Sequence, residues 1–292
     1  MYRLEVISRT VLILICVGLA TGCGSTRAAN GKTAVVAAFY PLAFAAEQVA
    51  GTSADIEDLT PSGAEPHDIE LAPQAVARIE RADVVLYLGH GFQPAVSDAV
   101  RNASGRAVDV LEGLPLHSGS GQDQDLTADP HVWLDPVLFE RVVVDIAAAL
   151  HRRAAAAPLL RRLSTLDRQY RVGLRHCARK EIVTSHAAFA YLARRYGLHQ
   201  VAITGLAPES EPTPRRLADV GAIVRRTHAT TVFFERLISP RLAQTVAREA
   251  GARTAVLDPI EGLTPGEQAR GDTYLSIMRR NLRTLRKALA CR

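Results

Sequence analysis

The strongest constraint on the fold is an alternation of strand-like and helix-like segments that occurs twice along the chain. Short apolar runs alternate with amphipathic stretches of about ten residues, which is typical of βαβ units on a parallel sheet. The first series covers residues 34–88 and the second covers residues 181–257. Between the two, apolar residues recur at spacings of three and four from Leu159 to Leu174, which predicts a long helix. The pattern therefore predicts an α/β protein of two lobes, each with a mainly parallel sheet flanked by helices, bridged by a long helix.

The individual elements follow from the same periodicity. The apolar runs predict strands at residues 34–39, 56–60, 84–88, 181–185, 200–204, 231–234 and 254–257. The amphipathic stretches predict helices at residues 41–49, 73–81, 137–151, 187–196, 214–227, 240–250 and 273–290. A polar segment at residues 113–129 has no periodicity and is expected to be a loop.

Composition excludes several other classes of protein. Hydrophobic residues make up 48% of the 292 residues and charged residues 22%, so a disordered or fibrous chain is excluded. No apolar run reaches the roughly eighteen residues that a membrane span needs. Residues 1–150 hold 9 basic and 19 acidic residues, whereas residues 151–292 hold 26 and 11. No aromatic-rich or zinc-finger pattern accompanies the basic residues, so we expect no nucleic-acid partner.

The N-terminus carries an export signal. Arg3 and Arg9 precede an apolar stretch at residues 11–20, which has the length of a secretory signal core. The small residues before Cys23 resemble a bacterial lipoprotein cleavage site, which predicts a signal peptide at residues 1–22, a lipid on Cys23 and a flexible tether at residues 23–32. The expected location is extracytoplasmic, anchored by lipid to the bacterial cell membrane. The alternative is a plain secretory signal in which the cysteine is incidental.

Four residues that can bind metal stand where predicted strands or loops end. These residues are His67, His131, His186 and Asp258. Ligands bind open parallel α/β sheets beyond the carboxyl ends of the strands, so the fold can bring these four side chains to one edge. Three imidazoles and one carboxylate suit a borderline divalent cation. Their wide separation in sequence forms no local motif, so the residues alone leave the site open.

A resemblance to a known family supports these four residues as a set. The segments PSGAEPHDIEL, DPHVWLDP, EIVTSHAAFAYLARRYGL and AVLDPIEGL, in this order after a lipoprotein signal, resemble the metal-binding subunits of zinc and manganese ABC importers, the ZnuA/TroA-like solute-binding proteins. The resemblance implies one cation between the lobes, held by His67, His131, His186 and Asp258. It implies an N-terminal lobe at residues 33–157, a linking helix at 158–178 and a C-terminal lobe at 179–292. The 113–129 loop lacks the histidine-rich run common in zinc members, and Gln93 stands where a carboxylate is frequent.

The resemblance implies a binding protein that delivers its ion to an ABC permease and its ATPase. Three nitrogen ligands with one carboxylate favour Zn(II) over Mn(II), and the family tends to have histidine at the position of His186 in zinc binders. We expect a monomer. We also expect no enzymatic activity, because the predicted ligand set fills the open position that a catalytic zinc keeps for water. A manganese importer component, a secreted zinc hydrolase and a surface adhesin are the alternatives.

The remaining cysteines predict a disulfide. Cys16 leaves with the signal peptide and Cys23 takes the lipid, so the folded part keeps Cys177 and Cys291. Export permits oxidation, and a bridge would tie the end of the closing helix to the start of the second lobe. This bridge requires the two Cα atoms to lie within about 7 Å. Two free thiols, or a bond from Cys291 to another molecule, are the alternatives.

Overall fold

The structure is a computed structural model that describes residues 31–118 and 126–292. The predicted signal peptide, Cys23 and most of the predicted tether lie outside the described residues, as does part of the 113–129 loop. Thr33–Arg292 forms one compact unit, and the description below concerns that unit. Within the described residues no helix combines the length and hydropathy of a membrane span.

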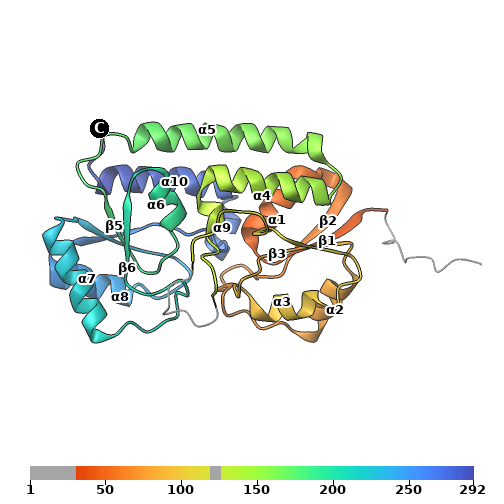
Figure 1. Cartoon of the computed structure of the whole chain (residues 1–292), viewed down its shortest axis with the longest axis horizontal. Helices are drawn as coiled ribbons and strands as arrows, with labels where there is room; N and C mark the ends of the chain where they lie inside the picture. The colour runs from red at the N-terminus through yellow and green to blue at the C-terminus, as the bar shows by residue number, and fades with distance from the viewer. Residues whose placement is uncertain (1–30, 119–125) are drawn as a thin grey trace, which may run out of the picture. The chain divides into compact units, whose positions relative to one another are not determined.

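The N-terminal lobe is a parallel four-stranded sheet with helices on both faces (Figure 1). Its strand order is β2-β1-β3-β4, and every pairing is parallel. The central strands β1 and β3 carry the most apolar residues, because both of their faces are covered. The lobe consists of β1 (Thr33–Ala37), α1 (Tyr40–Ala50), β2 (Ala54–Asp58), α2 (Pro73–Arg81), β3 (Val84–Tyr87), α3 (Pro94–Val100), β4 (Arg106–Asp109) and α4 (Pro136–Ala149).

The C-terminal lobe repeats this topology. Its strand order is β6-β5-β7-β8, again all parallel, so each strand occupies the place of its counterpart in the first lobe. Helices α7 and α8 pack together on one face of the sheet, while α6 and α10 cover the other (Figure 1). The lobe consists of β5 (Glu181–Thr184), α6 (Ala190–Arg195), β6 (His199–Ala202), α7 (Pro214–Arg226), β7 (Thr231–Phe234), α8 (Arg241–Ala250), β8 (Arg253–Val256), α9 (Pro265–Ala269) and α10 (Tyr274–Ala288).

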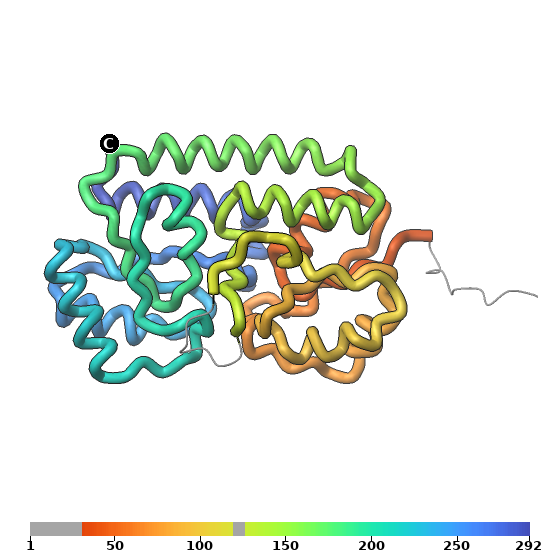
Figure 2. Tube along the Cα trace, viewed as in Figure 1, coloured from red at the N-terminus to blue at the C-terminus, as the bar shows by residue number. Residues whose placement is uncertain are grey.

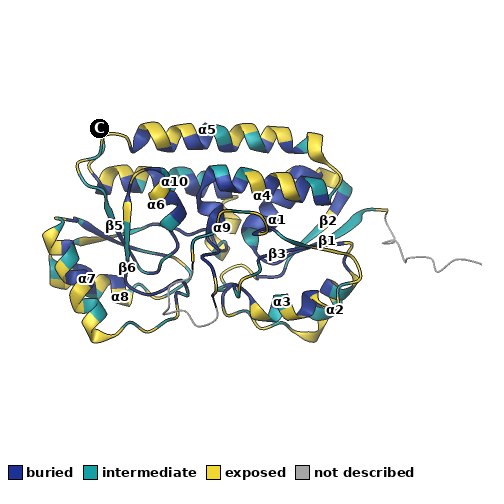
Figure 3. Cartoon of the chain, viewed as in Figure 1, coloured by how far each residue is buried: buried dark blue, intermediate teal, exposed yellow. Residues whose placement is uncertain are grey.

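Helix α5 (Ala157–Gly173) joins the lobes. It lies across α4 of the first lobe and α10 of the second, and Figure 2 shows the chain passing along it from one lobe to the other. Its apolar stripe, which includes Leu159, Leu163 and Leu166, is buried, while its outer face is exposed (Figure 3). One continuous hydrophobic core runs through both lobes beneath α5, and a smaller core lies against α7 and α8. The predicted two-lobed α/β fold with a long helix is confirmed.

Three elements differ from the sequence-based prediction. The sequence pattern did not indicate α3, β4 or α9. Strand β4 is an edge strand whose four residues are all exposed or partly exposed, so it has no apolar run to detect. Helices α3 and α9 have seven and five residues, which is too short for a helical period to repeat.

The predicted disulfide is confirmed. Cys177 and Cys291 are bonded, with their Cα atoms 3.8 Å apart. The backbone N–H of Arg292 also donates to the carbonyl of His176 at 3.0 Å. The end of the chain is therefore tied to the segment that enters the C-terminal lobe.

Candidate metal centre

Three of the four predicted ligands lie together, and a different carboxylate completes the group. The side chains of His67, His131, His186 and Glu261 place one ligand atom each within 4.8 Å of one another. All four residues are buried. His67 follows β2, His186 follows β5 and Glu261 follows β8, while His131 directly precedes a short turn of 3-10 helix at Val132–Leu134. The group thus lies where the carboxyl ends of the two sheets face each other, as expected for a parallel α/β scaffold.

The distances within the group match a four-coordinate ion. Glu261 Oε1 lies 3.1 Å from His131 Nε2, 3.2 Å from His186 Nε2 and 3.6 Å from His67 Nε2. The Nε2 atoms of His131 and His186 are 3.3 Å apart. A tetrahedron with metal–ligand bonds of about 2.0 Å has edges of about 3.3 Å, so these spacings suit zinc. His67 Nε2 and Glu261 Oε2 are buried without a hydrogen-bond partner, which leaves both side chains with unused capacity to bind an ion.

Two of the histidines have a carboxylate on the opposite ring nitrogen. His131 Nδ1 lies 2.8 Å from Asp129 Oδ1, and His186 Nδ1 lies 2.8 Å from Glu235 Oε1. A carboxylate on Nδ1 accepts its proton, which leaves the Nε2 lone pair directed at the metal position. Among the described residues, no carboxylate lies within ion-pair distance of His67 Nδ1. The carboxylates of Asp129 and Glu235 therefore orient two of the three rings.

The pKa values reflect these partners. Burial lowers the pKa of His131, but the hydrogen bonds to Asp129 and Glu261 outweigh burial and raise it. Burial also lowers the pKa of His186, and the carboxylates of Glu235 and Glu261 overcome this effect and raise it well above its ordinary value. For His67, burial dominates and lowers the pKa despite the proximity of Glu261.

The two acidic residues behave differently. Burial alone would raise the pKa of the Glu261 carboxyl, but His186, His131 and His67 hold it well below its ordinary value. Glu65 accepts a hydrogen bond from the backbone N–H of His67 at 3.2 Å. Burial, followed by the charge of Glu261, raises the pKa of Glu65 to about 9. Glu261 is thus the ionised carboxylate of the group, while Glu65 supports the loop of His67.

Asp258, the fourth predicted ligand, lies outside the group. Its Oδ1 accepts from the backbone N–H of Ile260 at 2.8 Å, and its Oδ2 lies 3.6 Å from Arg236 Nε. The chain turns at Ile260, which has φ of 58°, and the turn directs the side chain of Glu261, not that of Asp258, toward the histidines. The structure therefore places the carboxylate of Asp258 in the turn and that of Glu261, three residues later, beside the histidines.

The sequence analysis did not identify three residues of the site, Glu235, Glu261 and Asp129, although the first two had a detectable signal. Glu235 is the first residue after β7, so the rule that identified His186 at the end of β5 applied to it as well. Glu261 lies within the AVLDPIEGL segment already singled out. Asp129 precedes His131 by two residues and had no distinguishing pattern of its own. His90, which also follows a strand, is exposed and contacts Thr127 Oγ1 at 3.0 Å, so it lies outside the histidine group.

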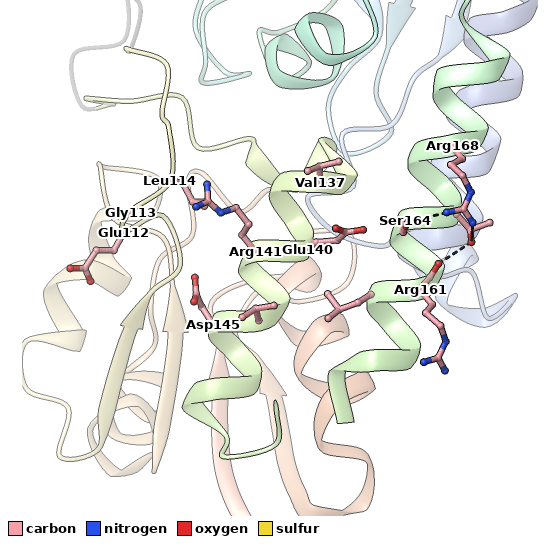
Figure 4. Close-up of a pocket in the computed structure, with 13 residues that line it drawn as sticks. Glu112, Gly113, Leu114, Val137, Glu140, Arg141, Asp145, Arg161, Ser164 and Arg168 are labelled. Carbon is pink, nitrogen blue, oxygen red and sulfur yellow. Dashed lines mark hydrogen bonds between the residues drawn. The ribbon is translucent and has the colours of Figure 1, made fainter. Parts of the chain in front are cut away.

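A groove lies elsewhere on the molecule. It has a volume of about 990 Å³ and lies between α4, α5 and the segment at residues 112–114 (Figure 4). The charged residues that α4 and α5 contribute to its lining are Glu140, Arg141, Asp145, Arg161 and Arg168. None of the residues that line it belongs to the histidine group, so the candidate metal centre does not depend on this groove.

The chain has two α/β lobes, and a buried group of three histidines and one carboxylate lies where their edges face each other. This arrangement is that of a two-lobed protein with a candidate metal centre between the lobes. The family described as zinc-uptake complex component A, periplasmic, matches residues 35–288, and the chain belongs to this family. Curated proteins match the chain in sequence, and solved structures match it in fold.

The relatives include proteins named for zinc. The chain is 35% identical over 301 residues to the zinc-binding lipoprotein AdcA of Streptococcus pneumoniae, covering 95% of this chain and 60% of that protein. It is 33% identical to the high-affinity zinc uptake system protein ZnuA of Bacillus subtilis, covering 98% of this chain and 97% of that protein. The Zn(II)-bound ZnuA-like domain of S. pneumoniae AdcA has a TM-score of 0.75 and 36% identity, covering 89% of this chain and 99% of that domain. The chain thus spans about three fifths of the length of the curated streptococcal protein and nearly all of the Bacillus protein.

Proposed function

We propose that this chain captures a zinc ion outside the cytoplasmic membrane and delivers it to the permease of an ABC importer, which an ATPase drives. The observation that carries the proposal is the convergence of His67, His131, His186 and Glu261 at distances that match the edges of a zinc tetrahedron. The names of the relatives, a zinc-binding lipoprotein and a zinc uptake protein, support the same ion.

The donor set supports zinc as the cargo. Three imidazole nitrogens and one carboxylate suit Zn(II), whereas Mn(II) sites prefer more oxygen ligands. The filled site would carry a charge of +1 from the ion and Glu261, and the carboxylates of Asp129 and Glu235 reduce it further. A bound ion is therefore compensated by buried carboxylates rather than by water, which supports tight capture.

The same geometry supports a binding role over catalysis. A catalytic zinc keeps one position open for water, whereas here four protein side chains can occupy all four positions around the ion. A monomer anchored through a lipid on Cys23 is consistent with a carrier that works beside a permease, with residues 33–157 and 179–292 as its lobes and residues 158–178 as the linking helix. Separation of the lobes would remove ligands from the ion and release it.

The experiment compares two matched carboxylate variants, Glu261→Gln and Asp258→Asn. Zinc titration against a competing chelator should give one ion per chain for the unmodified protein. Loss of one of four ligands removes about a quarter of the 10–16 kcal/mol that a structural zinc provides, so Glu261→Gln should weaken binding by about a hundredfold to a thousandfold. Asp258→Asn keeps the oxygen that accepts from Ile260 and should change affinity by less than about threefold.

Three outcomes would count against the proposal. Absence of stoichiometric zinc binding by the unmodified protein would reject the function. A larger loss for Asp258→Asn than for Glu261→Gln would restore Asp258 as the ligand. A preference for manganese in equal competition with zinc would reverse the choice of cargo.

A further inference from the structure

The segment that carries Glu261 is bonded to both lobes. Residues 258–263, named here the Glu261 segment, follow β8 of the C-terminal lobe. Its beginning is fixed to α10 of the same lobe, since Asn281 Oδ1 accepts from Asp258 N at 3.0 Å and Asn281 Nδ2 donates to Asp258 O at 2.7 Å. Asn281 is buried, so this pair of hydrogen bonds is shielded from water.

The rest of the segment is bonded to the N-terminal lobe. The indole N–H of Trp133 donates to the carbonyl of Pro259 at 2.7 Å. The carbonyl of Leu263 accepts from Gly63 N and from Ser62 Oγ, each at 2.8 Å. Glu261 thus stands midway between two carbonyls that are hydrogen-bonded across the lobe boundary.

Trp133 is itself held rigidly. Its side chain is buried, and its ring centroid lies 4.8 Å from that of Phe39 and 5.7 Å from that of Phe92. Its backbone carbonyl accepts from the hydroxyl of Tyr274 at 2.6 Å. A rigid ring with a single donor fixes the position of the carbonyl that it contacts, because the donor cannot follow a displacement of the acceptor.

We propose that Trp133 is a positioning residue for Glu261, and that its indole N–H, acting with Ser62 and Gly63, sets the Glu261 carboxylate against the three histidines when the lobes are together. The proposal rests on the zinc-binding function proposed above. It also assigns a role to Asp258, whose side chain and backbone shape the start of the Glu261 segment. Placement of the fourth ligand is thereby coupled to contact between the lobes.

The test is a double-mutant cycle between Trp133→Phe and Glu261→Gln. The phenyl ring keeps the aromatic packing but removes the donor to Pro259. Partners that orient a ligand typically contribute tenfold to a hundredfold in metal affinity, so Trp133→Phe should weaken zinc binding by about that factor. In the Glu261→Gln background the same change should cost less than about threefold, because the residue through which Trp133 acts has already been removed. The visible spectrum of the Co(II)-saturated Trp133→Phe protein should also change, since the carboxylate is displaced.

The matched control is Tyr170→Phe. Tyr170 is buried and donates its hydroxyl proton to the carbonyl of Met278 at 2.7 Å, so this change also removes a buried donor from a backbone carbonyl, but from one that belongs to α10 and not to the Glu261 segment. Both variants should unfold at lower temperature than the unmodified protein, and Trp133→Phe alone should lose zinc affinity. If Trp133→Phe does not fold, Ser62→Ala tests the second bond, because Ser62 is exposed and its removal should cost about twofold to tenfold in affinity.

The outcomes separate this inference from the proposed function. Failure of the unmodified protein to bind zinc would overturn both. Zinc binding that is weakened by Glu261→Gln but unaffected by Trp133→Phe would overturn the inference and leave the function standing. An equal loss for Trp133→Phe in both backgrounds would show that Trp133 acts through its neighbour His131, and would also overturn the inference.

Discussion

The two lobes have the same strand order, yet they present their histidines to the site in different ways. His186 is the second residue after β5, and its ring is held by Glu235, the first residue after β7. His67 stands nine residues beyond the end of β2, and among the described residues no carboxylate lies within ion-pair distance of its Nδ1. The pKa is accordingly raised for His186 and lowered for His67. His186 follows β5, the counterpart of β1, whereas His67 follows β2, the counterpart of β6. The repeated topology therefore does not place the two histidines at equivalent strand ends, and the loops decide which side chains reach the site.

The lobes also differ in what stabilises them. The disulfide Cys177–Cys291 encloses the whole C-terminal lobe, whereas the described part of the N-terminal lobe has no cysteine. The N-terminal lobe depends on the large shared core, while the α7 and α8 face of the C-terminal lobe has only a small core of its own. The disulfide therefore lies in the lobe whose buried apolar residues are divided between two hydrophobic cores.

The largest expected effect is on stability. The double variant Cys177→Ser/Cys291→Ser removes a bridge between residues separated by 114 positions, and the chain-entropy model gives a loss of about 4 to 5 kcal/mol for a loop of that size. The free energy of unfolding, measured by urea denaturation, should fall by about that amount. Zinc affinity at low denaturant should stay the same, because neither cysteine contacts the metal centre. Equal stability with and without the bridge would contradict the distinction between the lobes.

The next effect separates the two strand-end histidines. His67→Ala and His186→Ala should each weaken zinc binding by about a hundredfold to a thousandfold, as expected for loss of one ligand in four. Only His186→Ala leaves a buried carboxylate, that of Glu235, without its imidazole partner. The metal-free His186→Ala protein should therefore lose about 1–3 kcal/mol of stability that His67→Ala retains. Equal unfolding temperatures of the two metal-free variants would show that the Glu235 contact does not distinguish the lobes.

Most of the fold could be predicted from the sequence, because a buried parallel strand consists of consecutive apolar residues. Strands β3 and β7 show this clearly, since their residues are almost entirely apolar and buried. The edge strand β4 could not be predicted, because Arg106 and Ala107 are exposed and Asp109 is polar. What decides β4 is its pairing with β3, which is a long-range contact that local periodicity does not record.

The candidate site could be predicted only where a side chain stands at a strand end or in a recognised segment. His186 followed from the end of β5, and His67 and His131 followed from the segments PSGAEPHDIEL and DPHVWLDP. Glu261 could not be distinguished from Asp258, since both lie in one segment of a few residues. The choice between them depends on the turn at Ile260 and on hydrogen bonds from Asn281 and Trp133, which come from remote parts of the chain.

A smaller effect concerns the carboxylates that hold two of the rings. Asp129→Asn in the N-terminal lobe and Glu235→Gln in the C-terminal lobe should each weaken zinc binding by about tenfold to a hundredfold, because a neutral amide orients the imidazole less strongly. Glu181→Gln is the matched control, since Glu181 contacts His199 on the surface at 3.6 Å and lies outside the metal centre. Chelator competition measures all three variants. An effect of Glu181→Gln as large as that of Glu235→Gln would point to a general charge effect.

The last prediction distinguishes the histidines by their protonation, because zinc affinity changes by about tenfold per pH unit for each proton released. The pKa values of His131 and His186 are raised by their carboxylate partners, so both keep their protons to a higher pH than an ordinary histidine, and zinc must displace these protons. His67 has a lowered pKa and Glu261 stays ionised, so neither adds a proton near neutrality. Zinc affinity should therefore rise with pH through and above the ordinary histidine value of about 6.5, with release of up to two protons.

Calorimetry in buffers of different ionisation enthalpy counts these protons. Glu235→Gln should lower the count, because it removes the first carboxylate that raises the pKa of His186. Release of three protons near neutral pH would show that His67 titrates like the other two and would remove the contrast between His67 and the two histidines that contact carboxylates through Nδ1.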